Sequence, residues 1–192
     1  VHFLAGITWI GLLYFFNLIN AGFLKSLDGP TKNIVIPKLM PAALNWFRHG
    51  ATVTVLAGIG LYGYMYAKGG SGAIALGIGG LLGIIMMANV HAIIWPNQKK
   101  IIAAVTAAAQ GTPAPAEMAQ WGRTALLASR VNFLLSIPML FFMGAASHLP
   151  ITINPNSNLL ILASALGGVI LLLELNAINV QLALCDGQLT TV

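Results

Sequence analysis

The chain has 192 residues, of which 58% are hydrophobic and only 7% are charged, and it carries a formal net charge of +5. Soluble domains carry about 25% charged residues, so these few charges cannot cover a surface in water, and the composition excludes a soluble protein. The basic residues lie between the apolar segments, which favours membrane orientation over nucleic-acid binding as the reason for the positive charge. The sequence therefore predicts an all-α integral membrane protein without a nucleic-acid partner.

Five apolar segments are long enough to cross a hydrocarbon core of about 30 Å, which takes about 20 helical residues. We predict a single membrane domain over residues 1–192, in which the first four of five transmembrane helices form a cofactor-binding bundle. A polar loop with several prolines is expected from Lys25 to Pro41, and an amphipathic helix followed by a loop over 97–123. The spans are expected at roughly 1–24, 43–67, 73–95, 124–147 and 159–184.

The cations lie almost entirely on one side of the predicted bundle. Eight of the nine Lys and Arg residues lie in or beside the segments 25–45 and 97–123, and only Lys68 lies on the other side. Positively charged loops of this kind remain in the cytoplasm. We therefore predict a multi-pass protein of the bacterial inner (cytoplasmic) membrane, with both segments in the cytoplasm and the N-terminus outside.

Two residues late in the chain, Cys185 and Glu174, give only limited information about the function. Cys185 is the one cysteine of the sequence, and there is no CxxCH motif, so we expect neither a disulfide framework nor covalently attached haem. Glu174 lies deep in the fifth predicted span, where it either relays protons or pairs with Asn176 or with a partner subunit. The sequence leaves these roles open.

The four histidines fall on four different predicted helices. His49 lies three residues after Trp46 and His91 lies four residues before Trp95, so both are expected roughly 5–7 Å inside the cytoplasmic face at about 1.5 Å per residue. Their helices are antiparallel neighbours joined by a short turn, so the two imidazoles can face each other. His2 and His148 are the corresponding pair at the outer face.

These two pairs favour haem as the ligand, because imidazole is a common axial ligand of haem iron and helix bundles hold cofactors between facing side chains. Glycines on the helical stripes of the histidines would leave room for the ring. The sequence thus predicts two haem b groups, one ligated by His2 and His148 and the other by His49 and His91. Arg48 and Arg130, near the cytoplasmic level, are predicted to bind the propionates.

Each of these residues also has a purely structural explanation. An intramembrane histidine can hydrogen-bond a neighbouring helix, and a direct bond between His49 and His91 would satisfy both without a cofactor. Arg130 can extend to the membrane surface instead of binding an anion. Asn17 and Asn20 in the first span are interpreted as polar contacts between helices.

Several stretches resemble a known family. "VHFLAGITWIGLLYFFNL", "LNWFRHGATVTVLAG", "NVHAIIWPNQKKI" and "SRVNFLLSIPMLFFMGAASHLP" are similar to the N-terminal membrane domain of bacterial membrane urate oxidase (urate hydroxylase), over roughly residues 2–150. More distantly, the opening of the chain resembles haem-binding membrane proteins such as the membrane protoporphyrinogen oxidases. By this resemblance His2 and His148 match family positions. His49 and His91 stand where the urate oxidases carry aromatic residues, which implies an added ligand pair.

Our leading hypothesis is a membrane b-type cytochrome subunit that carries electrons across the bilayer through two bis-histidine haems. Its expected partners are the lipid bilayer, other membrane subunits, and a periplasmic cytochrome c or a quinone. The first alternative is a urate-oxidase-like membrane hydroxylase that works with a separate cytochrome c. The second is a structural subunit without a cofactor. An electron-transfer subunit is favoured over a self-contained enzyme, because so little of the chain lies outside the predicted spans.

Overall fold

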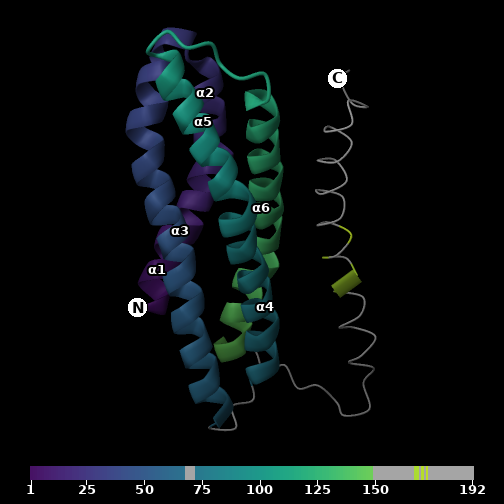
Figure 1. Cartoon of the computed structure of the whole chain (residues 1–192). Coiled ribbons are helices and arrows are strands. Elements are labelled where there is room, and N and C mark those ends of the chain that lie inside the picture. Colours follow the sequence, from purple (N-terminus) through teal and green to yellow (C-terminus); the bar gives the residue numbers. More distant parts are fainter. Residues whose placement is uncertain (68–71, 149–166, 169, 171, 173–192) are drawn as a thin grey trace.

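The computed structural model describes residues 1–67, 72–148, 167, 168, 170 and 172. Every regular element within these residues is a helix, which confirms the predicted all-α class. The helices up to His148 join into four long rods that pack side by side (Figure 1). The rods are α1 (His2–Tyr14), η1 (Phe15–Asn20) and α2 (Ala21–Ser26); α3 (Gly29–Ala67); α4 (Ala73–Asn89), η2 (Val90–Ile94) and α5 (Trp95–Ala108); and α6 (Met118–His148).

Three of these rods are long and apolar enough to cross a membrane: His2–Ser26, Ala73–Ala108 and Met118–His148. They contain the first, third and fourth predicted spans. The second predicted span, 43–67, is helical but belongs to α3, which is not among the three; its glycines and tyrosines lower its hydropathy. The fifth, 159–184, lies almost entirely outside the described residues.

The predicted loop from Lys25 to Pro41 is wrong, because most of it is helix. α2 ends at Ser26, Leu27 is extended, and α3 already begins at Gly29. Asp28 accepts a hydrogen bond from the backbone N–H of Thr31 at 3.4 Å, as an N-cap residue does. Hydrogen bonds from the Thr31 side chain and backbone hold the pKa of the exposed Asp28 carboxyl below its ordinary value.

α3 continues through Pro37 and Pro41, two of the residues that favoured a loop. The face of this segment that carries Met40, Leu44 and Phe47 is buried against the other rods. Tertiary packing of an apolar face outweighs local propensity in most helices of folded proteins, and here it outweighs two missing backbone donors.

The segment predicted at 97–123 is a helix and a loop, followed by the start of the next helix. α5 continues straight from α4 through η2, so Ala73–Ala108 is one rod of 36 residues, about 54 Å long. Its end is made by Gly111, whose φ of +90° is the left-handed conformation that favours glycine. Because the hydrocarbon core is only about 30 Å thick, part of α5 must extend beyond it.

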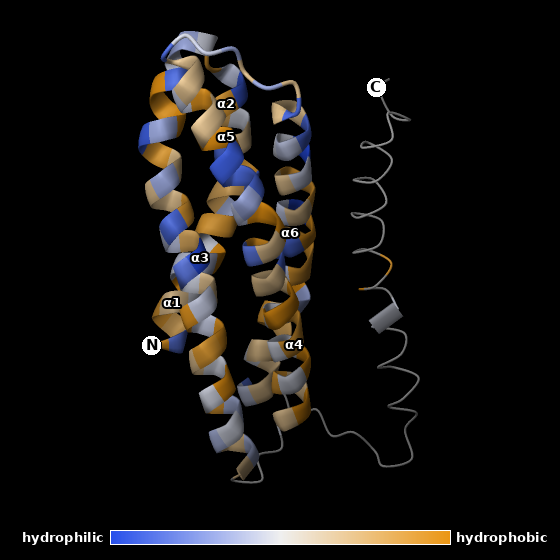
Figure 2. Ribbon diagram, viewed as in Figure 1, coloured by the Kyte–Doolittle hydropathy of each residue, from blue (hydrophilic) through white to orange (hydrophobic). Residues whose placement is uncertain are grey.

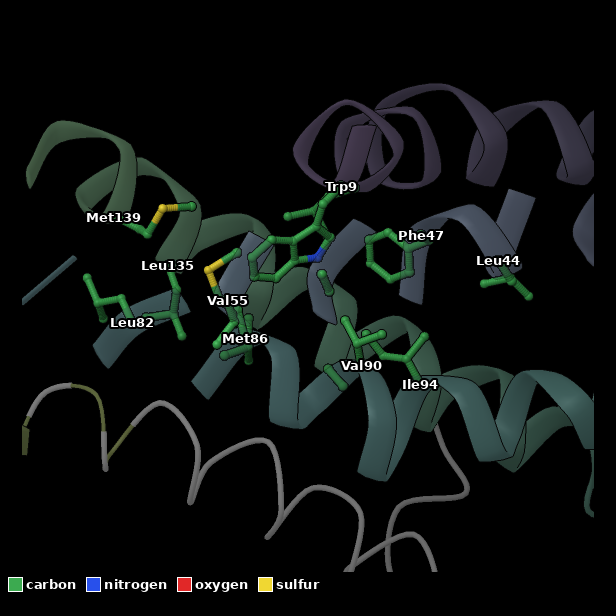
Figure 3. Packing of buried hydrophobic residues seen from close by; sticks show 14 of the residues in the cluster. Trp9, Leu44, Phe47, Val55, Leu82, Met86, Val90, Ile94, Leu135 and Met139 are labelled. Carbon is green, nitrogen blue, oxygen red and sulfur yellow. The ribbon is translucent and has the colours of Figure 1, made fainter. Parts of the chain in front are cut away.

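The core lies where all four rods meet. Trp9 of α1 is 1% exposed and reaches into the centre, with Phe47 on one side and Met86 and Leu135 on the other (Figure 3). α1 can approach α3 this closely because Gly50 has no side chain: a Cβ there would lie 3.3 Å from the backbone nitrogen of Trp9. Small residues allow this kind of close contact between membrane helices.

Candidate functional site

Two stretches of π-helix interrupt the rods, and both carry polar residues. η1 contains Asn17 and Asn20, and η2 contains His91. A π-helical turn bonds each residue to the fifth along the chain, is rare, and frequently occurs at functional sites. The polar side chains in and around η1 and η2 are therefore the first place to look for a site.

His91 has a hydrogen-bond partner on the neighbouring helix. Its Nε2 lies 2.9 Å from the hydroxyl oxygen of Thr52 in α3. The Thr52 hydroxyl donates its one proton to the carbonyl of Arg48 at 3.0 Å, so it accepts a hydrogen bond from His91 Nε2–H. This arrangement leaves Nδ1 as the unprotonated nitrogen of a neutral His91.

Cations and an aromatic ring continue this contact along the same two helices. The guanidinium carbon of Arg48 lies 4.3 Å from the centre of the Trp95 ring, and the Lys99 ammonium lies 5.6 Å from it. Both distances are within the range of cation–π attraction. We call the group formed by Arg48, Thr52, His91, Trp95 and Lys99 the α3–α5 seam.

The structure brings one predicted pair together and leaves Arg130 apart from it. His49 and Arg48 both lie close enough to His91 to interact with it electrostatically. The imidazoles of His49 and His91 are exposed on the surface of the described bundle. Arg130 lies on an exposed position of α6, outside the seam. The prediction that Arg48 and Arg130 bind the same group therefore gains no support from their positions.

His2 has a well-defined tautomer. Its Nδ1 lies 2.7 Å from the backbone carbonyl oxygen of Thr54, and since a carbonyl can only accept, Nδ1 carries the proton. The imidazole packs against Gly58, where a Cβ would lie 3.0 Å from His2 Cε1. Nε2 of a neutral His2 is consequently unprotonated and able to bind a metal.

The structure does not bring His2 to the level of His148. His2 lies beside Thr54 and Gly58, and α3 continues nine residues further to Ala67, about 14 Å along the helix. α6 ends with the exposed His148 at that far end, where Ala146 contacts the start of α4 at Gly72. Figure 1 shows the N-terminus partway along α3.

A buried polar face of α6 was missed in the sequence. Asn132 is fully buried; its amide donates to the carbonyl of Met86 at 2.9 Å, and its oxygen accepts from Asn89 at 2.9 Å. Ser136, also fully buried, lies 3.1 Å from the hydroxyl of Tyr14. One polar face of α6 thus binds both α1 and α4.

The signal for this face is present in "SRVNFLLS". Ser129, Asn132 and Ser136 are spaced three and then four residues apart, which is one side of a helix. Asn17 donates to the Ser129 hydroxyl at 2.8 Å, which agrees with the interpretation of Asn17 as a contact between helices. Arg130, the charged residue in the same stretch, points away from these contacts.

Comparison with known proteins assigns the sequence to a family. Residues 69–179 match the sequence model described as urate oxidase N-terminal. The match includes His91, His148 and the polar face of α6, and it begins after His2 and His49. Neither the curated proteins nor the solved structures give a match. The match covers more than half of the chain, so the resemblance inferred from the sequence is confirmed and the chain belongs to the urate oxidase N-terminal family.

Proposed function

We propose that this chain is the membrane subunit of a urate-oxidase-like oxidoreductase whose redox partner is a separate protein. The family match over residues 69–179 is the observation that carries this proposal. The matched region contains Asn132 with its interhelical bonds, and His91 of η2, which bonds to α3, so it includes polar features that distinguish this bundle from an apolar anchor. In this proposal urate gives up electrons, which pass to a cytochrome c.

The test is urate-dependent reduction of cytochrome c by membranes that contain the full chain. We expect the cytochrome to become reduced as urate disappears, and neither change to occur without urate. Membranes from the same host without the chain are the matched control. Equal rates in both preparations, or no urate loss in either, would reject the urate-oxidase-like function.

A b-type cytochrome is the second candidate, and the geometry of His2 favours it. Metal-bound histidines almost always donate their other ring N–H to a carbonyl or carboxylate, and His2 donates Nδ1–H to Thr54. We therefore propose that Nε2 of His2 would hold the iron of one haem b, which would supply a one-electron redox centre. His91 follows this pattern less closely, because its Nε2–H is donated to the hydroxyl of Thr52 and not to a carbonyl or carboxylate.

Haem content separates these possibilities. We expect the pyridine haemochrome of the purified protein to disappear in His2→Ala and to persist in His91→Ala. The two-haem prediction instead expects His49→Ala and His91→Ala each to lose about half of the haem and to keep the rest. A parent protein without a haem signal would exclude both cytochrome proposals. It would not affect the urate-oxidase-like proposal, which the cytochrome c assay tests separately.

A further inference from the structure

A cavity of about 260 Å³, partly open to the surface, lies between the rods near the end that contains α2 and α5. Side chains from all four rods line it, and most of them are apolar. Pockets for drug-sized ligands measure about 300–1,000 Å³, so this space suits one substituted ring and is too small for a porphyrin. The residues that define its chemistry are Phe16, Asn20, Lys25, Phe47, Gln98 and Ser129.

Asn20 gives the cavity an unsatisfied acceptor. The side chain is 5% exposed, and its amide nitrogen donates only to the sulfur of Met40, at 3.8 Å. Its carbonyl oxygen, Oδ1, has no hydrogen-bond partner among the described residues. A buried amide oxygen without a donor is costly, so a molecule in the cavity that carries an O–H or N–H would be stabilised there.

The other walls restrict what that molecule can be. Phe16 and Phe47 meet edge to face with their centroids 5.4 Å apart, and they form an aromatic wall for a flat ring. The Ser129 hydroxyl accepts from Asn17 and keeps its own proton. Gln98 and Lys25 are further donors for a second oxygen on the ligand.

We propose that this cavity binds the ring of a hydroquinone, with one ring hydroxyl donating to Asn20 Oδ1 and the second oxygen accepting from Gln98 or Lys25. A hydroquinone combines the flat apolar ring and the two polar oxygens that the walls require. It is also uncharged and dissolves in lipid, so it can reach a cavity for which three of the four lining rods are apolar enough to span a membrane. This site goes beyond the proposed oxidase function and requires neither urate nor haem.

The test compares two ligands with the same ring, one with two free hydroxyls and one in which both hydroxyls are methylated. The full chain in nanodiscs is titrated with tetramethylhydroquinone under anaerobic conditions, and separately with its dimethyl ether, with empty nanodiscs subtracted. We expect saturable binding of one hydroquinone per chain, with the ether binding roughly two- to tenfold more weakly, as expected for the loss of one hydrogen bond.

Two variants locate the binding. Asn20→Leu keeps the side-chain size and removes the acceptor, so it should reduce the affinity for hydroquinone to that for the ether and leave the ether unchanged. Leu126→Trp fills the cavity and should abolish binding of both ligands. Leu18→Trp, on an exposed position, is the matched control and should bind like the parent.

The proposal is overturned by equal binding of the two ligands, or by hydroquinone binding that Leu126→Trp leaves intact, since either result means partition into lipid. It is also overturned if the folded parent shows no saturable binding, in which case the cavity holds only water. If Asn20→Leu fails to fold, the ligand pair and the Leu126→Trp variant still decide.

Discussion

His91 was expected to need a polar partner because it lies in an apolar stretch, and its partner in the structure is a threonine. The bond to Thr52 satisfies one imidazole nitrogen without a cofactor and without the direct histidine pair considered as the alternative. The seam around it places Arg48 on Trp95. Whether His91 has a structural role therefore depends on how much the His91–Thr52 hydrogen bond contributes to the free energy of unfolding.

We predict a coupling free energy of about 0.5–1.5 kcal/mol between Thr52 and His91, the usual net value of a hydrogen bond. A double-mutant cycle with Thr52→Val and His91→Phe measures it through the free energy of unfolding in detergent. Thr106→Val is the control, because Thr106 makes the same bond to the carbonyl four residues earlier and its side chain is exposed. Additive effects at Thr52 and His91 would show that the bond contributes nothing.

Asn132→Ala should lower the free energy of unfolding by about 1–3 kcal/mol, because it removes two buried hydrogen bonds at once. The comparison is Asn97→Ala: the amide of Asn97 bonds the carbonyl of Ile93 in its own rod. Both variants are measured by denaturant-induced loss of helical circular dichroism. If Asn97→Ala is as damaging as Asn132→Ala, the interhelical bonds of α6 are not important for stability.

At the scale of elements, the approach of α1 to α3 depends on Gly50. Gly50→Leu would place a side chain against the backbone of Ala5 and Trp9 and should cost about 1–3 kcal/mol, the usual price of overpacking. Gly60→Leu lies in the same helix and meets nothing within 4 Å, so it should be tolerated. Thermal unfolding of the two variants should therefore differ clearly; similar midpoints would mean that α1 and α3 separate without cost.

The sequence predicted the helices better than the breaks between them. Hydropathy located the four rods of the described chain, because the membrane requires long apolar helices with their backbone groups bonded internally. It failed over Lys25–Pro41, where polar residues and prolines favoured a loop but packing of Met40 and Leu44 retained the helix. It also could not reveal η1 and η2, since one extra residue per turn leaves no mark on composition.

The candidate site was predictable only in part, for a similar reason. Similar distances from two tryptophans placed His49 and His91 at one level, and the two lie close enough to interact electrostatically. The same argument failed for His2 and His148, because counting residues from the ends of spans assumes rods of matched length, and α3 extends well past His2. The spacing of Ser129, Asn132 and Ser136 indicates one polar face of a helix. The prediction gave a role only to Arg130, the charged residue of the same stretch.

At the scale of the whole molecule, polar residues gather at the end of the bundle that contains α2 and α5 (Figure 2). This is the end where the cations of α5 lie, and we predict that it faces the cytoplasm. A cysteine at the exposed Gln110, in a background with Cys185 replaced by Ser, should resist membrane-impermeant thiol reagents in intact cells. Ser147→Cys, exposed at the opposite end, should react. Labelling at position 110 but not at position 147 would mean that the topology is the opposite of the predicted one.

The two π-helical segments have a consequence for comparing this chain with its relatives. A π turn holds one residue more than the α-helix around it, so losing a single codon within 15–20 or 90–94 would restore a regular helix. Because the π turn takes up the extra residue, the residues on either side of the deletion would keep their faces of the helix, and only the side chains within the turn would move. A one-residue gap at either place in an alignment would therefore mark a relative that keeps the packing of the rods but lacks the widened turn that carries Asn17 and Asn20, or His91.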